Sequence, residues 1–253
     1  MYKLRSEQIS QRLYLSMIII IFSLLFLSIP LIISSYQSYQ KADRALTEMS
    51  ALRAVADLAN KVSRERAPAN KVMSSTAEEL AANLNELHGY RKEVDLQIEQ
   101  TLQILNAAGF SAQVPGLSSN LKVTLQQGRQ AVDAYAALPR SERTSTQLDD
   151  AIKQMFMAWD SCQEILKNVL LHTVAKDTSV SDSYTLILIL ADLRDQAGRI
   201  ASNIIASVTF AEKIPENNLA RSLQTQHQAH YLWGLINTIQ PEQTKTPEYL
   251  AFN

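Results

Sequence analysis

The sequence is poor in residues that break helices or build tight turns. Only 6 glycines and 7 prolines occur among 253 residues, and a β protein with many tight turns normally needs more of both. Cys162 is the only cysteine, which excludes an intramolecular disulfide. The net charge of -1 gives no overall attraction to nucleic acid. Ala, Leu, Gln and Glu are abundant and form helices well, so the composition predicts an all-α protein.

Sequence signatures of common catalytic sites are absent too. There is no nucleotide-binding glycine loop, no zinc-protease helix motif and no serine-nucleophile elbow. His227 and His230 could share one helix face as a metal pair, but no third ligand accompanies them. We therefore expect no enzyme, no cofactor and no metal, with a histidine-metal enzyme as the remaining catalytic alternative. Cys162 and Trp159 lie in an apolar pattern and are expected in the core.

One long apolar run is present near the N-terminus. Residues 13–35 carry no charge, and about 20 apolar residues suffice for a helix to cross the hydrocarbon layer. A cleaved signal peptide would have a shorter apolar stretch, of roughly 7–15 residues, followed by a small-x-small cleavage site. Here the run is longer and is followed by SSYQSYQ. We predict an uncleaved transmembrane helix over residues 13–35.

Charges on either side of this run indicate its direction. Lys3, Arg5 and Arg12 precede it, and positive charge favours the cytoplasmic side. We expect residues 1–12 to be a cytoplasmic tail and the bulk of the chain to lie outside. In a Gram-negative bacterium this would be a single-pass inner-membrane protein with a periplasmic domain.

The remaining sequence predicts six helices and no strand, because apolar residues recur at alternating spacings of three and four. One continues from the apolar run and contains residues 63–70, and the second follows the capping signal Ser74-Ser75-Thr76. The other four cover about 121–135, 148–169, 186–204 and 215–240, with a break at 177–183. We expect an up-and-down, four-helix-type bundle over residues 36–240 and a loose tail over 241–253.

Polar residues interrupt the core pattern of the first helix. At the spacing of its apolar positions the next residues are Ser63, Arg66 and Asn70. A buried arginine needs an anion or a carboxylate as a partner. Pro68 removes a helical hydrogen bond just beyond it. A ligand site, a structural salt bridge and a frayed helix end all explain this pattern.

A second unusual segment is Leu193-Arg194-Asp195-Gln196-Ala197-Gly198-Arg199. Arg194 flanks a core position, and Gly198 costs about 1 kcal/mol relative to Ala inside a helix, which suggests a close approach or a small cavity. Arg199 follows Asp195 by four residues, so a surface ion pair explains it equally well.

Together the two segments resemble a known family. Residues 64–70, RERAPAN, are similar to a signature in the first periplasmic helix of sensor regions of bacterial transmembrane receptors, and LRDQAGR resembles a later segment of the same regions. These regions occur in chemoreceptors and diguanylate cyclases and resemble in style the nitrate- and nitrite-sensing helical domain. The resemblance implies that Arg66 and Arg194 face a ligand, with Arg64, Asn70 and Arg199 behind them.

The expected function is therefore signal transduction. A small anion, such as nitrate, nitrite or a carboxylate, would bind between helices and shift the first helix, and a homodimer through that helix is expected. The resembling receptors continue into a second membrane helix and an output module that this sequence lacks, so it is either a truncated form or signals through a partner. The alternative is a cell-envelope scaffold or protein-interaction module without a small ligand, in which internal carboxylates pair with the arginines.

Overall fold

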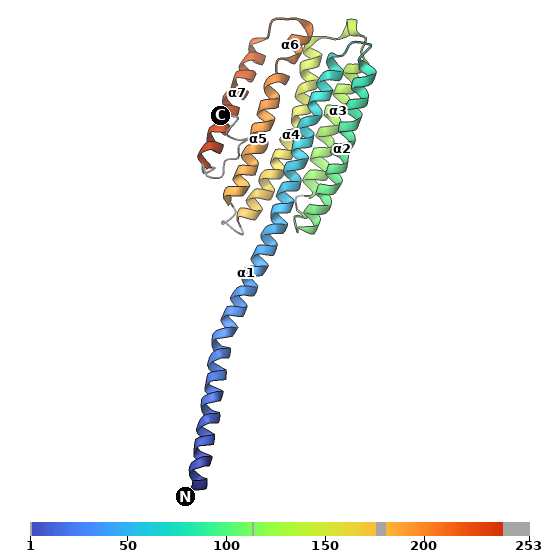
Figure 1. The fold of residues 1–253 in the computed structure, drawn as a ribbon. Helices are drawn as coiled ribbons and strands as arrows, with labels where there is room; N and C mark the ends of the chain where they lie inside the picture. The colour runs from blue at the N-terminus through green and yellow to red at the C-terminus, as the bar shows by residue number, and fades with distance from the viewer. Residues whose placement is uncertain (1, 113, 176–180, 240–253) are drawn as a thin grey trace. The chain divides into compact units, whose positions relative to one another are not determined.

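The protein is described by a computed structural model, which covers residues 2–112, 114–175 and 181–239. The long helices are α1 (Tyr2–Ser74), α2 (Leu80–Ala107), α3 (Lys122–Ala137), α4 (Ser145–Val174), α5 (Ser181–Ser202) and α7 (Glu216–Ile239). A π-helix (Gly116–Leu121), a 3-10 turn (Arg140–Glu142) and the short helix α6 (Ile205–Phe210) join them (Figure 1). Within the described residues no strand forms, which confirms the all-α prediction.

The chain divides into two units, Met1–Thr47 and Glu48–Asn253. The first unit is helical and exposes its apolar side chains, for example Phe26 at 79%. Ser23 and Ser28 donate their hydroxyls to carbonyls four residues earlier, so neither hydroxyl needs an outside partner. This helix is long and apolar enough to cross a membrane, and a signal sequence would share both features.

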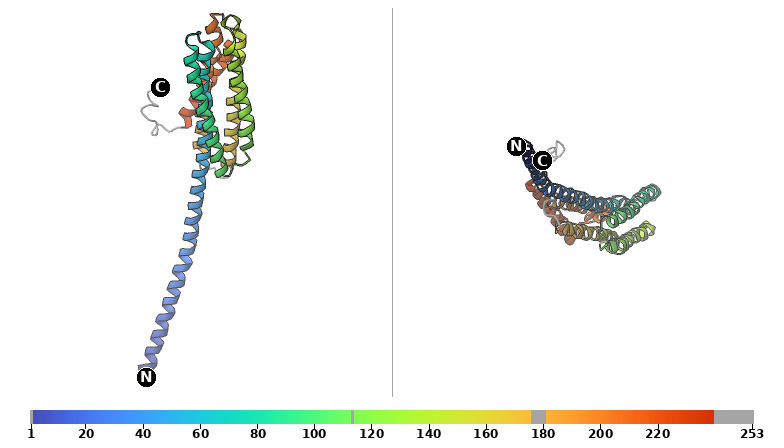
Figure 2. Two further views of the ribbon diagram at one scale, coloured as in Figure 1. Left: turned by 90° about the vertical axis from the view of Figure 1, so that its right-hand side faces the viewer. Right: turned by 90° about the horizontal axis from the view of Figure 1, so that it is seen from below.

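In the second unit the long helices run lengthwise beside one another (Figure 2). Side-chain hydrogen bonds connect neighbouring helices. Thr101 of α2 donates to the carbonyl of Ala54 on α1 at 3.2 Å, and Asp149 of α4 accepts from Arg221 of α7 at 3.1 Å. The helix α4 starts with a capping box in which Thr144 and Gln147 satisfy each other's backbone and side-chain groups.

Two apolar clusters form the main core. One contains Leu58 and Val62 of α1, and the other contains Ala69 and Val72, about two turns further along the same helix. The same division recurs on α2, between Leu87 and Val94, and on α3, between Leu125 and Val132. A smaller cluster joins α5 to α7. Ser63, Glu65 and Arg66 lie between the two main clusters, so a polar layer crosses the core at this level.

Most helix boundaries agree with the sequence, and a few differ. The helix α1 continues through Pro68 to Ser74, so the interpretation of residues 64–70 as a frayed end is wrong. The helix α2 begins at Leu80 rather than directly after Thr76, because Thr76 and Glu79 bond to each other in an intervening turn. The predicted break at 177–183 is described only from Ser181, where α5 has already begun. The tail 241–253 lies outside the described residues.

Candidate functional site

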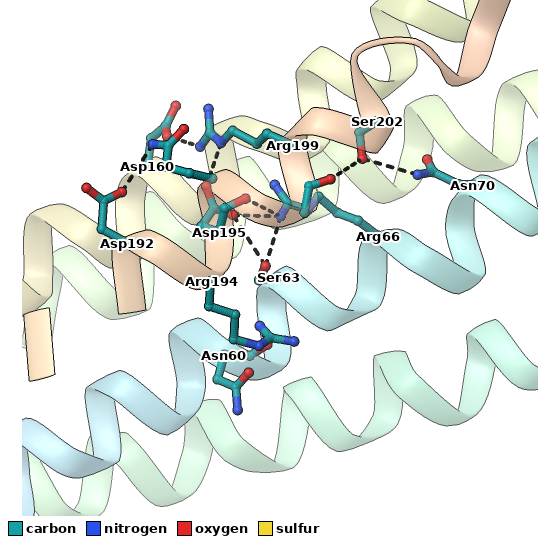
Figure 3. Close-up of polar contacts among 12 residues, drawn as sticks. Asn60, Ser63, Arg66, Asn70, Asp160, Asp192, Arg194, Asp195, Arg199 and Ser202 are labelled. Atoms are coloured by element: carbon teal, nitrogen blue, oxygen red, sulfur yellow. Dashed lines mark hydrogen bonds and ion pairs between the residues drawn. The ribbon is translucent and has the colours of Figure 1, made fainter. Parts of the chain in front are cut away.

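The centre of the candidate site is an ion pair between α1 and α5. Arg66 Nη2 lies 2.7 Å from Asp195 Oδ1, and the two side chains are 5% and 0% exposed (Figure 3). Ser63 joins the pair: its Oγ accepts from Arg66 Nη2 at 2.8 Å and donates to Asp195 Oδ1 at 3.3 Å. Arg66 therefore faces the core as its spacing predicted, and its anion is a carboxylate of the protein.

The surroundings of the Arg66 guanidinium are tight and partly apolar. The Phe156 ring lies 5.1 Å from Arg66 Cζ, and a Cβ placed on Gly198 would lie 2.8 Å from Nη2. Gly198 thus accommodates a close approach, as its position in the helix predicted, and the approaching group is a side chain. The other terminal nitrogen, Nη1, is buried and has no hydrogen-bond partner among the described residues. Such a group is costly to bury unpaired.

Burial lowers the pKa of Arg66. The Asp195 carboxylate opposes this shift, and the neighbouring positive charges of Arg199 and Arg194 add to it. Arginine nonetheless stays charged at physiological pH. The charged form of Arg66 therefore depends on a neighbouring anion more than the charged form of an exposed arginine does.

Arg199 holds the other oxygen of the same carboxylate. Its Nε donates to Asp195 Oδ2 and its Nη2 to Asp160 Oδ1 on α4. Burial disfavours the charge of Arg199, but Asp195 and Asp160 outweigh burial and raise its pKa. The predicted pairing of Arg199 with Asp195 is present, whereas its surface character is wrong because Asp195 is fully buried. Asp195 is thus clamped between α1 and its own helix, with a link to α4.

The other three predicted site residues lie around this pair. Arg194 is exposed and donates from Nη1 to the carbonyl of Asn60 on α1 at 3.0 Å (Figure 3). Asn70 donates to Ser202 Oγ at 3.3 Å, about one turn further along α1. Arg64 is exposed and stacks over the ring of Tyr90 on α2, with Cζ 5.6 Å from the centroid. Arg66, Arg199 and Arg194 are therefore close together. Arg64 contacts a different helix, but burial and the charge of Arg64 together lower the pKa of Arg194.

A second charged group, unpredicted from the sequence, lies on the other side of α1. Glu65 is 1% exposed and accepts from Arg129 of α3, at 2.9 Å from Nε and 2.8 Å from Nη2. Arg91 of α2 lies 3.7 Å from Glu65 and pairs with Asp133, while Arg129 also pairs with Asp95. Burial disfavours the charge of Arg129, but Glu65 and Asp95 outweigh it and raise its pKa.

A signal for Glu65 is present in the sequence. Leu58, Val62, Ala69 and Val72 form a second apolar row on α1 at the same alternating spacing, and Glu65 occupies the middle position of that row. The helix therefore buries two rows rather than one narrow face. The two rows together predict that Glu65 is buried as well as Arg66.

The weaker candidates from the sequence have structural explanations. Among the described residues no group of three or more His, Cys, Asp or Glu side chains could hold a metal ion, and His227 and His230 are exposed on α7. Cys162 is fully buried, burial raises the pKa of its thiol, and Trp159 packs in the same core cluster, as predicted for both.

Comparison with known proteins adds no relative: no family model, no curated protein and no solved structure matches this chain.

Proposed function

We propose that this chain is a membrane-anchored sensor for signal transduction, with an up-and-down helical bundle that binds a small anion between α1 and α5. The bundle would lie outside the cytoplasm, in the periplasm if the host is a Gram-negative bacterium. The apolar helix would cross the inner membrane with the N-terminus inside. Ligand binding would displace α1 relative to α5, and a homodimer would pair α1 helices.

The observation that carries this proposal is the arrangement around Asp195. Its buried carboxylate is shared by Arg66 of α1 and Arg199 of α5, and Arg66 Nη1 is buried beside it without a partner. A planar anion such as nitrate or a carboxylate fits a guanidinium edge through two parallel hydrogen bonds. An incoming anion would therefore compete with Asp195 for Arg66 and loosen the link between the two helices.

The helix α1 would transmit this change from the ligand site to the apolar segment. It bears Arg66, and its residues 13–35 form the apolar segment. A ligand shifts a conformational equilibrium only when it binds the two arrangements with different affinities. Here the anion-free arrangement has the Arg66–Asp195 bond, and the anion-bound arrangement would exchange that bond for a ligand contact.

A scaffold or protein-interaction role is the second candidate, and one observation favours it. Asp195 already neutralises Arg66, so the polar layer is an internal ion pair that needs no ligand. Buried ion pairs often confer structural specificity rather than stability. Under this role Arg66 and Asp195 would only align α1 with α5.

A thermal-shift screen of the full chain in detergent separates the two roles. The screen would use nitrate, nitrite, small carboxylates and amino acids, and a specific ligand at a hundred times its Kd stabilises the fold by about 2.7 kcal/mol. The sensor role predicts a saturable shift that Arg66→Met abolishes and that Arg53→Met, at an exposed position on the same helix, retains. A folded protein that responds to none of these compounds supports the scaffold role.

A further inference from the structure

A second polar site lies where α4 and α7 begin. A cleft of about 480 Å³ opens there between the first turns of these helices and the short helix α6. Ser145 and Thr146 of α4, Ser207 of α6 and Asn217 of α7 line it. None of the residues discussed above for the Arg66–Asp195 pair contributes to its wall.

Two helix N-termini meet in this cleft. In α4 the Thr144 hydroxyl accepts from the Gln147 N–H, and among the described residues the N–H groups of Ser145 and Thr146 have no partner. In α7 the Pro215 carbonyl accepts from Asn218 and Leu219, so the Asn217 N–H also remains available. Each helix N-terminus carries the equivalent of about half a positive charge, which favours an anion.

The charged side chains of the cleft nearly balance one another. Asp149 accepts from Lys153 at 2.8 Å and from Arg221 at 3.1 Å, and Asp150 pairs with Lys153 at 3.0 Å. Asp149, Lys153 and Arg221 line the cleft, and Asp150 outside it neutralises Lys153, so the group contains two cations and two carboxylates. The positive excess comes from the two helix ends, so a singly charged anion suits the cleft better than a doubly charged one.

Ser207 supplies an independent indication of a ligand. It is only 3% exposed and lines the cleft, and no described residue forms a hydrogen bond with its hydroxyl. A helical serine usually donates back to the carbonyl four residues earlier when nothing else is available. Arg221 adds a second unsatisfied donor, because its Nε is buried without a partner. The Ser207 hydroxyl, Arg221 Nε and three backbone N–H groups are therefore donors at this cleft that have no acceptor among the described residues.

We propose that this cleft binds a small monocarboxylate. Its carboxylate would accept from the Ser207 hydroxyl and from the free N–H groups at the starts of α4 and α7. The remaining volume would hold a short organic substituent. This site would join α4, α6 and α7, and it is independent of the anion proposed at Arg66.

Thermal-shift titrations of the full chain in detergent test this site. Acetate, lactate and benzoate would be compared with phosphate and sulfate at equal ionic strength. At least one monocarboxylate should raise the Tm saturably, and Ser207→Ala should raise its half-saturating concentration about tenfold, the effect of losing one hydrogen bond to a charged group. Ser207→Ala removes no hydrogen bond to another described residue. Asn217→Pro, in the first turn of α7 where proline is tolerated, removes one of the backbone N–H groups of the proposed site.

Ser50→Ala, at an exposed position on α1, is the matched control and should retain the full response. Arg66→Met should also retain it, which distinguishes this cleft from the site proposed between α1 and α5. Equal shifts with sulfate and phosphate would overturn the proposal. So would a carboxylate response that is unchanged in both cleft variants, or the absence of any response.

Discussion

Gly198 of α5 leaves the space that the Arg66 guanidinium of α1 occupies. A Cβ at residue 198 would lie 2.8 Å from Arg66 Nη2, closer than side-chain atoms pack in folded proteins. The absence of a side chain on one helix thus permits the buried charge on the other. The pair is a structural unit, and its two members should respond to substitution together.

Overpacking a core usually costs about 1–3 kcal/mol, and the helix propensity of Ala returns up to about 1 kcal/mol, so we expect Gly198→Ala to lower the free energy of unfolding by about 0–2 kcal/mol. The matched control is Gly234→Ala on α7, where nothing lies within 4 Å of the new Cβ, and this change should gain up to about 1 kcal/mol in helix propensity. Chemical denaturation measures both. In an Arg66→Met background the cost of Gly198→Ala should shrink, and an unchanged cost would contradict the contact.

Glu65 provides the second prediction. Because Glu65 is buried between Arg129 and Arg91, Glu65→Gln leaves two guanidinium groups without their shared carboxylate and should cost about 3–5 kcal/mol. Glu86→Gln removes an exposed pair with Lys71 and should cost no more than about 1 kcal/mol. Equilibrium unfolding compares the two variants. Equal costs would show that the layer around Glu65 is solvated in solution.

Asp192 should make stability depend on pH. Burial raises its pKa above the ordinary value of 3.8, and nearby Asp195 adds to this shift. The Gln196 hydrogen bond and the charges of Lys167 and Arg199 oppose it. A carboxyl whose folded pKa is raised favours folding when protonated, so its contribution is lost as pH rises through the folded pKa. Asp192→Asn should therefore stabilise the protein at neutral pH, and the gain should vanish below 3.8. Urea unfolding across this range tests the sign, and a gain independent of pH would contradict it.

The apolar segment gives the fourth prediction. If residues 13–35 are an uncleaved anchor, the full chain should remain in the membrane fraction after alkaline carbonate extraction, and deletion of residues 13–35 should release it. N-terminal sequencing of the mature protein separates the anchor from a signal sequence. A mature chain that begins after residue 35 would identify a cleaved signal.

The helices could be predicted from the sequence because each has a repeating apolar face, and six long helices follow that pattern. The short helix α6 and the π-helix before α3 could not. Each is 6 residues long, too short for a periodic signal. The helix α2 starts later than predicted, because the Thr76–Glu79 bonds form a separate turn that resembles a helix cap in sequence.

Only part of the candidate site could be predicted from the sequence. The position of Arg66 in the core follows from spacing along one helix, and this holds in the structure. The pairing of Arg66 with Asp195 could not be predicted, because the two residues are 129 positions apart in the sequence. Asp195 could equally well pair with Arg199 in its own helix. Arg129 and Arg91 could not be predicted for the same reason, because the tertiary fold determines which helices lie beside α1. The cleft at the starts of α4 and α7 likewise depends on that arrangement.

The adjacent placement of Glu65 and Arg66 limits how α1 can move. Successive residues of an α-helix point about 100° apart, and here the two carry opposite charges toward oppositely charged surroundings. Turning α1 by one position would bring Arg66 toward Arg129 and Arg91, where like charges repel. Rotation about the helix axis is therefore electrostatically locked. The movements left to α1 are sliding along its axis and tilting, so a signal carried by this helix would be a piston or a lever rather than a twist.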